Sequence, residues 1–489
     1  MTKAIVVGSG PNGLAAAVTL ARRGLDVTVL EAADTPGGGT RSAELTLPGV
    51  LHDECSGFHP LALDNAFAGE ADLSRYGLEW LWPEIQYAHP LDHGAGAAAW
   101  QDVATTARHL FDDGDTWAKV FGPLARNFPD TTDDFLRPML HVPEHLFKLA
   151  HFGGFAGMPA ALVAQLWKTP EARALFGGVA AHAFRPLTTL ASSAIGVALG
   201  TAAHAYGWPV AKGGSQAIAT ATIAALEGLG GRVETGVQVR SLADLPDAEV
   251  IMLDTGPAAA ADIAGDRLPP RVRRGLRRFR HGPGAFVVNF AVEGGIPWEY
   301  QQARAAGTVH VAGTFEEIAA AERQINQGVM PERPFVLLGQ QYLADPGRSA
   351  GDVHPIDAYA HVPAGYEGDA TEAIEEQIER FAPGFRERIV GRHVRSTAEL
   401  EGKNPNYVGG DIVTGANSAF QLLLRPRVSV DPYSLGAPGL FLCSAATPPG
   451  AGAHGMCGYN AARSALAQLG EEVQLGEEAR VGPRTVDGD

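Results

Sequence analysis

The feature that most constrains this chain is the stretch VVGSGPNGLAAA, from Val6 to Ala17. A strand-like apolar run ends in a glycine-rich turn, and a helix-like run follows at once. In a G-x-G-x-x-G turn, the first glycine permits the tight bend, the second lets the backbone approach a pyrophosphate, and the third lets the helix pack closely on the strand. The stretch therefore predicts a strand–turn–helix unit that binds a dinucleotide. The turn residues predicted to contact it are Gly8, Gly10, Pro11, Asn12 and Gly13.

An acidic residue at the expected spacing strengthens this prediction. A second strand-like run, Leu25 to Leu30, ends at Glu31, 18 residues beyond Gly13. We expect a helix from about Pro11 to Arg23 to direct its free N–H groups and the positive end of its dipole at the phosphates. Glu31 is then placed to accept hydrogen bonds from the adenosine ribose. The acid has no arginine beside it, which argues against a 2′-phosphate on that ribose.

A second glycine cluster follows the acid and includes Gly38 and Gly39, with Arg41 close behind. It gives another close approach of the backbone, and Arg41 can reach a phosphate or a flavin edge. The pairing of the two clusters resembles the two-part FAD fingerprint of the amine-oxidase and phytoene-desaturase class of enzymes. In that class an arginine often follows the glycine pair directly. Here Gly39 fills that place and the arginine comes two residues later.

Two later segments extend the resemblance. GWPVAKGGSQAIATATIAALEGLGGRVETGVQVRSL, from Gly207 to Leu242, reads as a helix opened and closed by glycines. A strand, Arg232 to Thr235, and a second strand around Val239 are expected after it. The segment resembles the second FAD-binding segment of phytoene-desaturase-like flavoproteins, in which the residue matching Val239 lies against the adenine through its backbone.

The segment PGLFLCSAATPPGAGAHGMCGYNAARSAL, from Pro438 to Leu466, reads as a buried strand, a glycine-rich loop and a helix from about Met456. A helix N-terminus can stabilise negative charge on the N1–C2=O2 edge of a reduced flavin. The resemblance places the backbone near Met456 and Cys457 under the flavin. Many flavoproteins have an acid after the strand to hold the ribityl chain. None stands here, so Thr447 is the candidate for that contact.

With these motifs in order along the chain, the protein is identified as a member of the phytoene-desaturase-like family of FAD-dependent oxidoreductases, in its soluble bacterial branch. The resemblance implies an α/β fold, in which a discontinuous Rossmann-type FAD-binding domain adjoins an α+β substrate domain with a helix-rich insert and an antiparallel sheet. We assign 1–70, 208–285 and 425–470 to the FAD-binding domain and 71–207 and 286–424 to the substrate domain. A flexible tail is expected over 471–489.

Composition narrows the class of partner. A net charge of −17 argues against nucleic acid. Three cysteines without a CxxC pair favour a reduced, cytoplasmic setting. No metal is expected, because the acidic run Asp112, Asp113 and Asp115 lacks calcium-loop spacing and reads as a solvated helix start. Peripheral membrane contact through the apolar stretch near 150–170 and a homodimer are both left open.

The expected reaction is abstraction of a hydride from a C–H bond of an apolar or conjugated small molecule, with electrons passing to oxygen, a quinone or another carrier. The helix-rich insert, with five tryptophans from Trp80 to Trp167, favours an apolar pocket. A flavin accepts the hydride at N5, so the protein must align the substrate and in some cases remove a proton. The candidate catalytic residues are His454 in the flavin-edge loop, His59 after the second glycine cluster, and Tyr359 on a strand expected to face the cavity.

Three alternatives stay open. An FAD amine oxidase usually needs an aromatic cage beside the flavin, and the loop from Gly455 to Gly458 offers none. A carotenoid-type isomerase that uses reduced flavin has no net redox change. A carrier of prenylated proteins or lipids shares this fold without FAD, but the retained glycine fingerprint argues against it.

Overall fold

The computed structural model describes residues 2–138 and 141–470, so the predicted tail at 471–489 lies outside the described residues. Its first sheet is parallel, with the strand order β16-β10-β1-β2-β9. Apart from the edge strand β9, these runs are mostly apolar, as expected of strands covered on both faces. The strands are β1 (Lys3–Val7), β2 (Asp26–Leu30), β9 (Arg232–Glu234), β10 (Val250–Leu253) and β16 (Leu440–Leu442).

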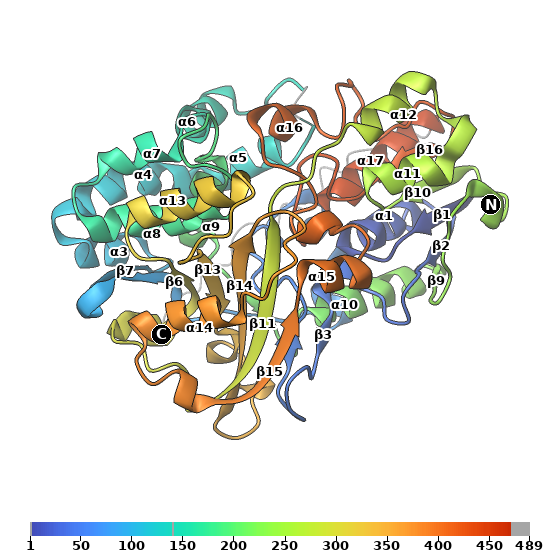
Figure 1. Cartoon of the computed structure of the whole chain (residues 1–489). Coiled ribbons are helices and arrows are strands. Elements are labelled where there is room, and N and C mark those ends of the chain that lie inside the picture. Colours follow the sequence, from blue (N-terminus) through green and yellow to red (C-terminus); the bar gives the residue numbers. More distant parts are fainter. Residues whose placement is uncertain (1, 139–140, 471–489) are drawn as a thin grey trace, which may run out of the picture.

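Helices cover both faces of this parallel sheet (Figure 1). Two apolar clusters lie between sheet and helices, one with Val6 and Val29 and the other with Ile5 and Leu253. The arrangement is the predicted Rossmann-type unit, and it confirms the α/β fold class. On one face lie α1 (Pro11–Ala21), α10 (Gln216–Gly228) and α17 (Met456–Gln468); on the other lie α11 (Pro257–Ala264) and α12 (Pro270–Arg277).

The second sheet has the order β15-β11-β14-β13-β12-β6-β7 and is antiparallel except where β12 pairs with β6. Its last two strands, β6 and β7, come from the segment expected to be helix-rich, so that expectation was incomplete there. Both are short and almost wholly buried, and they form only because β12 offers an edge more than 200 residues away. The strands are β6 (Ile85–Pro90), β7 (Gly96–Ala99), β11 (Gly284–Glu293), β12 (Ala306–Val311), β13 (Val336–Gly339), β14 (Val353–Val362) and β15 (Ile389–Arg395).

A helical layer lies on the far side of the long strands β11 and β14 from the parallel sheet (Figure 1). Trp117 and Trp167 are buried at its centre. Within the described residues no single helix is both long and apolar enough to cross a membrane; only α6 taken together with the segment Ala160–Leu166, at a bend of 93°, meets that test. The layer contains α3 (Val103–His109), α4 (Gly114–Arg126), α5 (Phe128–Phe135), α6 (Leu146–Ala156), α7 (Ala160–Val163), α8 (Pro170–Ala181), α9 (Ala194–Ala205) and α13 (Phe315–Asn326).

Smaller elements connect these layers, and two local predictions are wrong. The residues around Val239 form no strand, because after β9 the chain bonds to the turn that follows β2: the N–H groups of Gly236 and Val237 donate to the Ala33 and Glu31 carbonyls. Asp113 is not solvated: it is buried and accepts hydrogen bonds from the N–H groups of Lys168 and Thr169. The connecting elements are α2 (Ala66–Ala71), α14 (Thr371–Phe381), α15 (Thr397–Lys403), α16 (Ala419–Leu424), β3 (Ser42–Ala43), β4 (His52–Asp53), β5 (Trp80–Leu81) and β8 (Val210–Ala211).

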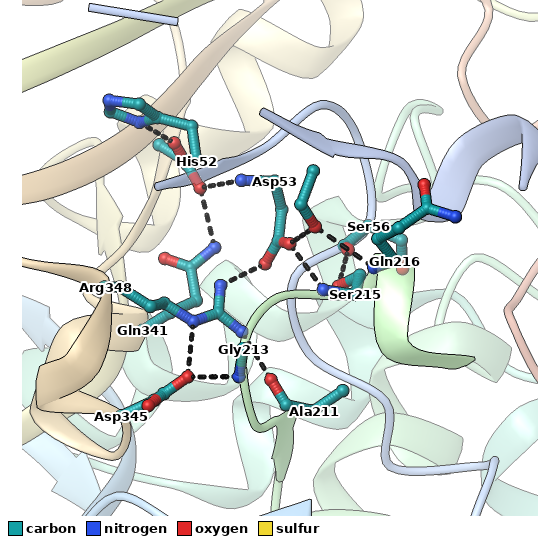
Figure 2. Close-up of polar contacts among 12 residues, drawn as sticks. His52, Asp53, Ser56, Ala211, Gly213, Ser215, Gln216, Gln341, Asp345 and Arg348 are labelled. Atoms are coloured by element: carbon teal, nitrogen blue, oxygen red, sulfur yellow. Dashed lines mark hydrogen bonds and ion pairs between the residues drawn. The ribbon is translucent and has the colours of Figure 1, made fainter. Parts of the chain in front are cut away.

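A buried ion pair joins the loop between β13 and β14 of the second sheet to β4 and to the start of α10 (Figure 2). Arg348, from the loop between β13 and β14, donates to Asp53 of β4 at 2.6 Å and to Asp345 at 3.1 Å. Asp53 also accepts from the N–H of Ser215, at the start of α10, at 2.7 Å. Burial alone would raise the pKa of Asp53, but the charge of Arg348 and these hydrogen bonds hold it below its ordinary value. The pair therefore fixes three segments that are remote in sequence.

We predict that Asp53→Asn lowers the free energy of unfolding by ~3–5 kcal/mol, because it leaves a buried guanidinium without its main partner. Equilibrium urea unfolding measures this change. The matched control is Glu79→Gln, which removes an exposed pair with Lys212 and should change stability little. Equal losses of unfolding free energy in the two variants would show that the buried pair does not stabilise the contact between these segments.

Candidate cofactor and substrate cavity

One large cavity, of about 1110 Å³, extends between the parallel sheet, the second sheet and the helical layer. Its lining includes residues from the glycine turn, from β14 and from α6, α9 and α16. One end is therefore polar and formed by backbone, whereas the other is apolar. Of the predicted site residues, the cavity brings together Gly8, Gly10, Pro11, Asn12, Glu31, Gly38, Gly39, Arg41, His59, Val239, Tyr359 and His454.

The two glycine clusters meet at the polar end. Gly8 has a φ of +101°, a conformation that side-chain-bearing residues rarely adopt, and its N–H donates to the Leu30 carbonyl. A Cβ built on Gly38 would lie 2.9 Å from the Cα of Gly10, so the clusters approach each other more closely than any side chain allows. Gly10 is the N-cap of α1 and Pro11 is its first residue. The N-terminal end of α1, where the helix dipole is positive, therefore opens onto the cavity.

Glu31 directly follows β2, at the carboxyl edge of the sheet. Its Oε2 accepts from the Ser9 N–H at 2.9 Å and from the Ser9 hydroxyl at 2.5 Å. Its Oε1 accepts from the Ala33 N–H at 2.9 Å and lies 3.5 Å from Arg41. These contacts hold the carboxylate against the glycine turn. Arg41 also donates to the Thr35 carbonyl, and this bond holds the guanidinium beside the Glu31 carboxylate.

Asp254 is a site residue that our sequence analysis did not identify. It directly follows β10, and its Oδ2 accepts from the Gly13 N–H at 3.0 Å. A Cβ on Gly10 would lie 2.6 Å from the same oxygen. Burial raises the pKa of Asp254 from 3.8 to about 7; the charge of Glu31 adds to this rise, and hydrogen bonds from Gly13 and Gly10 oppose it. A carboxyl that titrates near neutral pH thus lies beside the N-terminus of α1.

These residues fit a dinucleotide. Glycines stand wherever a side chain would block the turn, and helical N–H groups and a held carboxylate line the same wall. Within the described part of the chain, the buried amide oxygen of Asn12 has no hydrogen-bond partner. Such a buried acceptor is costly unless a ligand or water satisfies it. Val239 lines the same end through a segment that contacts the turn after β2, where the Val237 N–H donates to the Glu31 carbonyl.

The loop from Ser444 to Gly455 forms a second wall, but four predicted contact residues lie outside the lining. Gly13 faces Asp254, Thr447 donates its hydroxyl to the Ser444 carbonyl, and Met456 and Cys457 are buried in α17. Their cofactor contacts stay predictions. The Met456 N–H donates to Nδ1 of His454, so this imidazole caps α17. Burial lowers the pKa of His454 to about 4, which keeps the ring neutral.

His59 and Tyr359 both line the cavity. Nε2 of His59 lies 2.9 Å from the Ser215 hydroxyl, and burial lowers the pKa of His59 to about 4. Tyr359 lies on β14 with its ring stacked near Phe184, and burial raises the pKa of its phenol well above the ordinary value. At neutral pH the cavity therefore presents one neutral imidazole and one protonated phenol from these positions. Their catalytic roles stay predictions.

The other end of the cavity is an apolar chamber. The tryptophans of the insert do not line it, contrary to expectation: Trp117 and Trp167 pack in the core behind it, and Trp208 is the tryptophan in the described lining. The rings of Trp117 and Trp167 fill the core of the layer, and leucine, isoleucine, alanine and phenylalanine side chains face the chamber. Those side chains include Leu149, Phe152, Ala156, Ile195, Ala198, Leu199, Leu422 and Leu423.

Comparison with known proteins agrees with this geometry. Residues 6–65 match a family model described as an NAD(P)-binding Rossmann-like domain. A rat protein, pyridine nucleotide-disulfide oxidoreductase domain-containing protein 2, is 25% identical over 234 residues, which are 45% of this chain and 37% of that protein. Hydroxyneurosporene desaturase of Cereibacter sphaeroides is 46% identical over 65 residues, 13% of this chain and 12% of the desaturase. The matches therefore span well under half of these relatives.

Solved structures share the fold over nearly the whole chain. An oxidoreductase from Methanosarcina mazei has a TM-score of 0.63 at 14% identity, covering 95% of this chain and 100% of that one. A putrescine oxidase bound to putrescine has a TM-score of 0.62 at 17% identity, covering 96% and 99%. The chain thus contains a Rossmann-like domain and shares its fold with these solved oxidoreductases. A Rossmann-like, dinucleotide-binding domain agrees with FAD, the cofactor expected from the sequence.

We predict that Asp254→Asn removes a pH-dependent loss of stability. The unfolded chain releases this proton near pH 4 and the folded protein near pH 7, so the wild-type fold is progressively destabilised as the pH rises between these values. Asparagine cannot titrate, yet its amide oxygen can still accept from Gly13. Melting temperatures of cofactor-free protein from about pH 5 to about pH 8 should therefore fall further in the wild type than in the variant.

Asp266→Asn, at a fully exposed side chain, is the control for the general effect of removing a carboxylate. Parallel pH profiles for the wild type and Asp254→Asn would contradict the assignment of a neutral-range titration to Asp254.

Proposed function

We propose that the protein is a phytoene-desaturase-like, FAD-dependent dehydrogenase or desaturase that removes a hydride from a C–H bond of an apolar or conjugated small molecule. One observation carries the proposal: a single cavity joins the dinucleotide-type glycine turn to an apolar chamber. A cofactor held at the turn and a substrate held in the chamber would then share one enclosure. Partial matches to a desaturase and to an oxidoreductase domain protein support the same chemistry.

Each part of the wall has a role in this proposal. The N-terminus of α1, with Gly10 and Gly38 beside it, holds the pyrophosphate. Glu31 holds the adenosine ribose, and the backbone at Val239 lies along the adenine. The loop from Ser444 to Gly455 positions the ring system. Bound FAD supplies a hydride acceptor, which no side chain of the protein can provide.

The chamber aligns the substrate and excludes water. Its leucine, isoleucine and alanine side chains bind an apolar chain by removing its surface from water, at roughly 25 cal/mol per Å². Among the groups on the described wall that could accept or donate a proton beside the reacting carbon are the neutral His59 and the phenol of Tyr359. Oxygen, a quinone or another carrier would remove the electrons.

Anaerobic mixing tests the reaction directly. The FAD-loaded protein is mixed with long-chain alkenes and polyenes, with primary amines, and with the same alkenes fully saturated as controls. The proposal predicts that the flavin band near ~450 nm bleaches with alkenes or polyenes and not with amines. Bleaching by amines alone would replace this proposal with the amine-oxidase alternative. Polyene that is isomerised by the chemically reduced protein, with no bleaching of the oxidised protein by polyene, would favour the isomerase.

The cofactor site is tested by Gly10→Val. A Cβ at this position would lie 2.6 Å from Asp254 and would occupy the space of the pyrophosphate, so we expect FAD binding to be lost. Bound FAD is measured by absorbance after gel filtration. Gly69→Val is the matched control, because a Cβ there meets nothing within 4 Å. Full flavin occupancy in Gly10→Val would refute this placement of the cofactor.

A further inference from the structure

Two arginines, Arg348 and Arg425, are fully buried among the residues that the structure describes, and only one of them is paired with carboxylates. Arg348 has two carboxylate partners, Asp53 and Asp345. Although burial alone would lower the pKa of Arg348, these carboxylates raise it. Arg425 is only 1% exposed, and among the described residues no carboxylate lies within 4.0 Å of it. Burial lowers the pKa of Arg425. Buried charges in proteins are normally paired, so Arg425 is the exception that requires explanation.

Neutral oxygens hold Arg425 in place. Its Nε donates to the Gln421 carbonyl at 3.3 Å, Nη1 to the Ala445 carbonyl at 3.1 Å, and Nη2 to the amide oxygen of Asn417 at 3.2 Å. The carboxylate whose charge acts on it, Asp411, accepts hydrogen bonds from the N–H groups of Gly282 and Gly415 instead. A guanidinium carries five N–H donors, so these three bonds leave two of them unused.

A second unpaired guanidinium stands on the other side of Asn417. Arg185 is half-buried and donates to the Asn417 carbonyl and to the Thr189 hydroxyl. It too has no ion pair within the described residues, and burial lowers its pKa. Two cations therefore contact one asparagine, and neither forms an ion pair within the described residues. Their combined field favours an anion at this place.

The cavity reaches this place. Arg425 and Asn417 both line it, between the apolar residues of α16 and the loop that follows β16. The loop closes tightly over the guanidinium: a Cβ on Gly450 would lie 2.6 Å from Nη1. Glycine at 450 is thus required for Arg425 to occupy its position. The unused N–H donors of Arg425 are held rigidly at the wall shared by the loop and the chamber.

We propose that Arg425 is the anion-binding residue of this cavity, and that it takes an anionic oxygen, with Arg185 adding to the field. The inference rests on the proposed function and deepens it. Either of two groups could supply this anionic oxygen: a carboxylate on an otherwise apolar substrate, or the pyrimidine edge of the reduced cofactor. The first would define the substrate class as amphipathic carboxylates, and the second would make Arg425 a residue that sets the reduction potential.

Two measurements on the FAD-loaded protein separate these sources. Calorimetry compares the binding of decanoate with that of decanol, which has the same chain and no charge. Redox titration gives the potential of the bound FAD. The variants are Arg425→Met and Arg425→Lys. Arg427→Met is the control, because Arg427 is half-buried two residues away but is not part of the described lining of the cavity.

If the anion is a substrate carboxylate, Arg425→Met binds decanoate at least tenfold more weakly, with decanol binding and the potential unchanged. If it is the reduced cofactor, Arg425→Met lowers the affinity for reduced relative to oxidised FAD about tenfold, a fall of ~30 mV for a two-electron couple, with decanoate binding unchanged. Arg425→Lys should recover part of either effect, since it keeps the charge and loses the planar fork.

The inference is overturned if Arg425→Met folds with the wild-type melting temperature and changes neither quantity relative to Arg427→Met. If Arg425→Met does not fold, Arg425→Lys decides: unchanged decanoate binding and an unchanged potential would overturn it as well. Failure of the proposed function gives a different result. A wild-type protein that binds no FAD would refute the proposed function, whereas calorimetry with decanoate would still test Arg425 in the cofactor-free protein.

Discussion

The structure depends on a buried ion pair, Arg348 with Asp53, that joins the loop between β13 and β14 to β4 and the start of α10. The same guanidinium donates to the Ala211 carbonyl, and Asp345 accepts from the Gly213 N–H (Figure 2). The cost of removing these charges from water is offset because all three guanidinium nitrogens of Arg348 donate hydrogen bonds and both carboxylates accept them. The network fixes the segment that carries Ser215, and Ser215 in turn holds His59 at the cavity wall.

The cavity lies where differently built layers meet. The glycine turn, Glu31 and Asp254 directly follow strands of the parallel sheet, at the carboxyl edge where ligands bind in open α/β sheets. The second sheet contributes Tyr359, and the helical layer contributes the apolar chamber. A polar cofactor site and an apolar substrate site therefore share one cavity, because the carboxyl edge of the parallel sheet and the apolar face of the helical layer both line it. The positive charge of Arg425 lies within that shared wall.

Local signals in the sequence predict much of this. The glycine spacing gave the turn, and strands β1, β2, β10 and β16 follow apolar runs that only a covered parallel sheet explains. Asp254 could have been found from its place directly after the β10 run. The failures are nonlocal. β6 and β7 need an edge provided by β12, and the role of Asp113 depends on N–H groups 55 residues away. That Arg425 lacks a carboxylate partner shows only in three dimensions.

The measurement that tests the central claim most directly is the flavin content of the purified chain, by absorbance of the native protein and of the cofactor released on denaturation. A cavity built as described should hold about one FAD per chain, with a band near ~450 nm that bleaches on anaerobic reduction. A chain that carries no flavin and takes up none when FAD is added would contradict the account, and a carrier of apolar molecules would then be the better explanation of the same cavity.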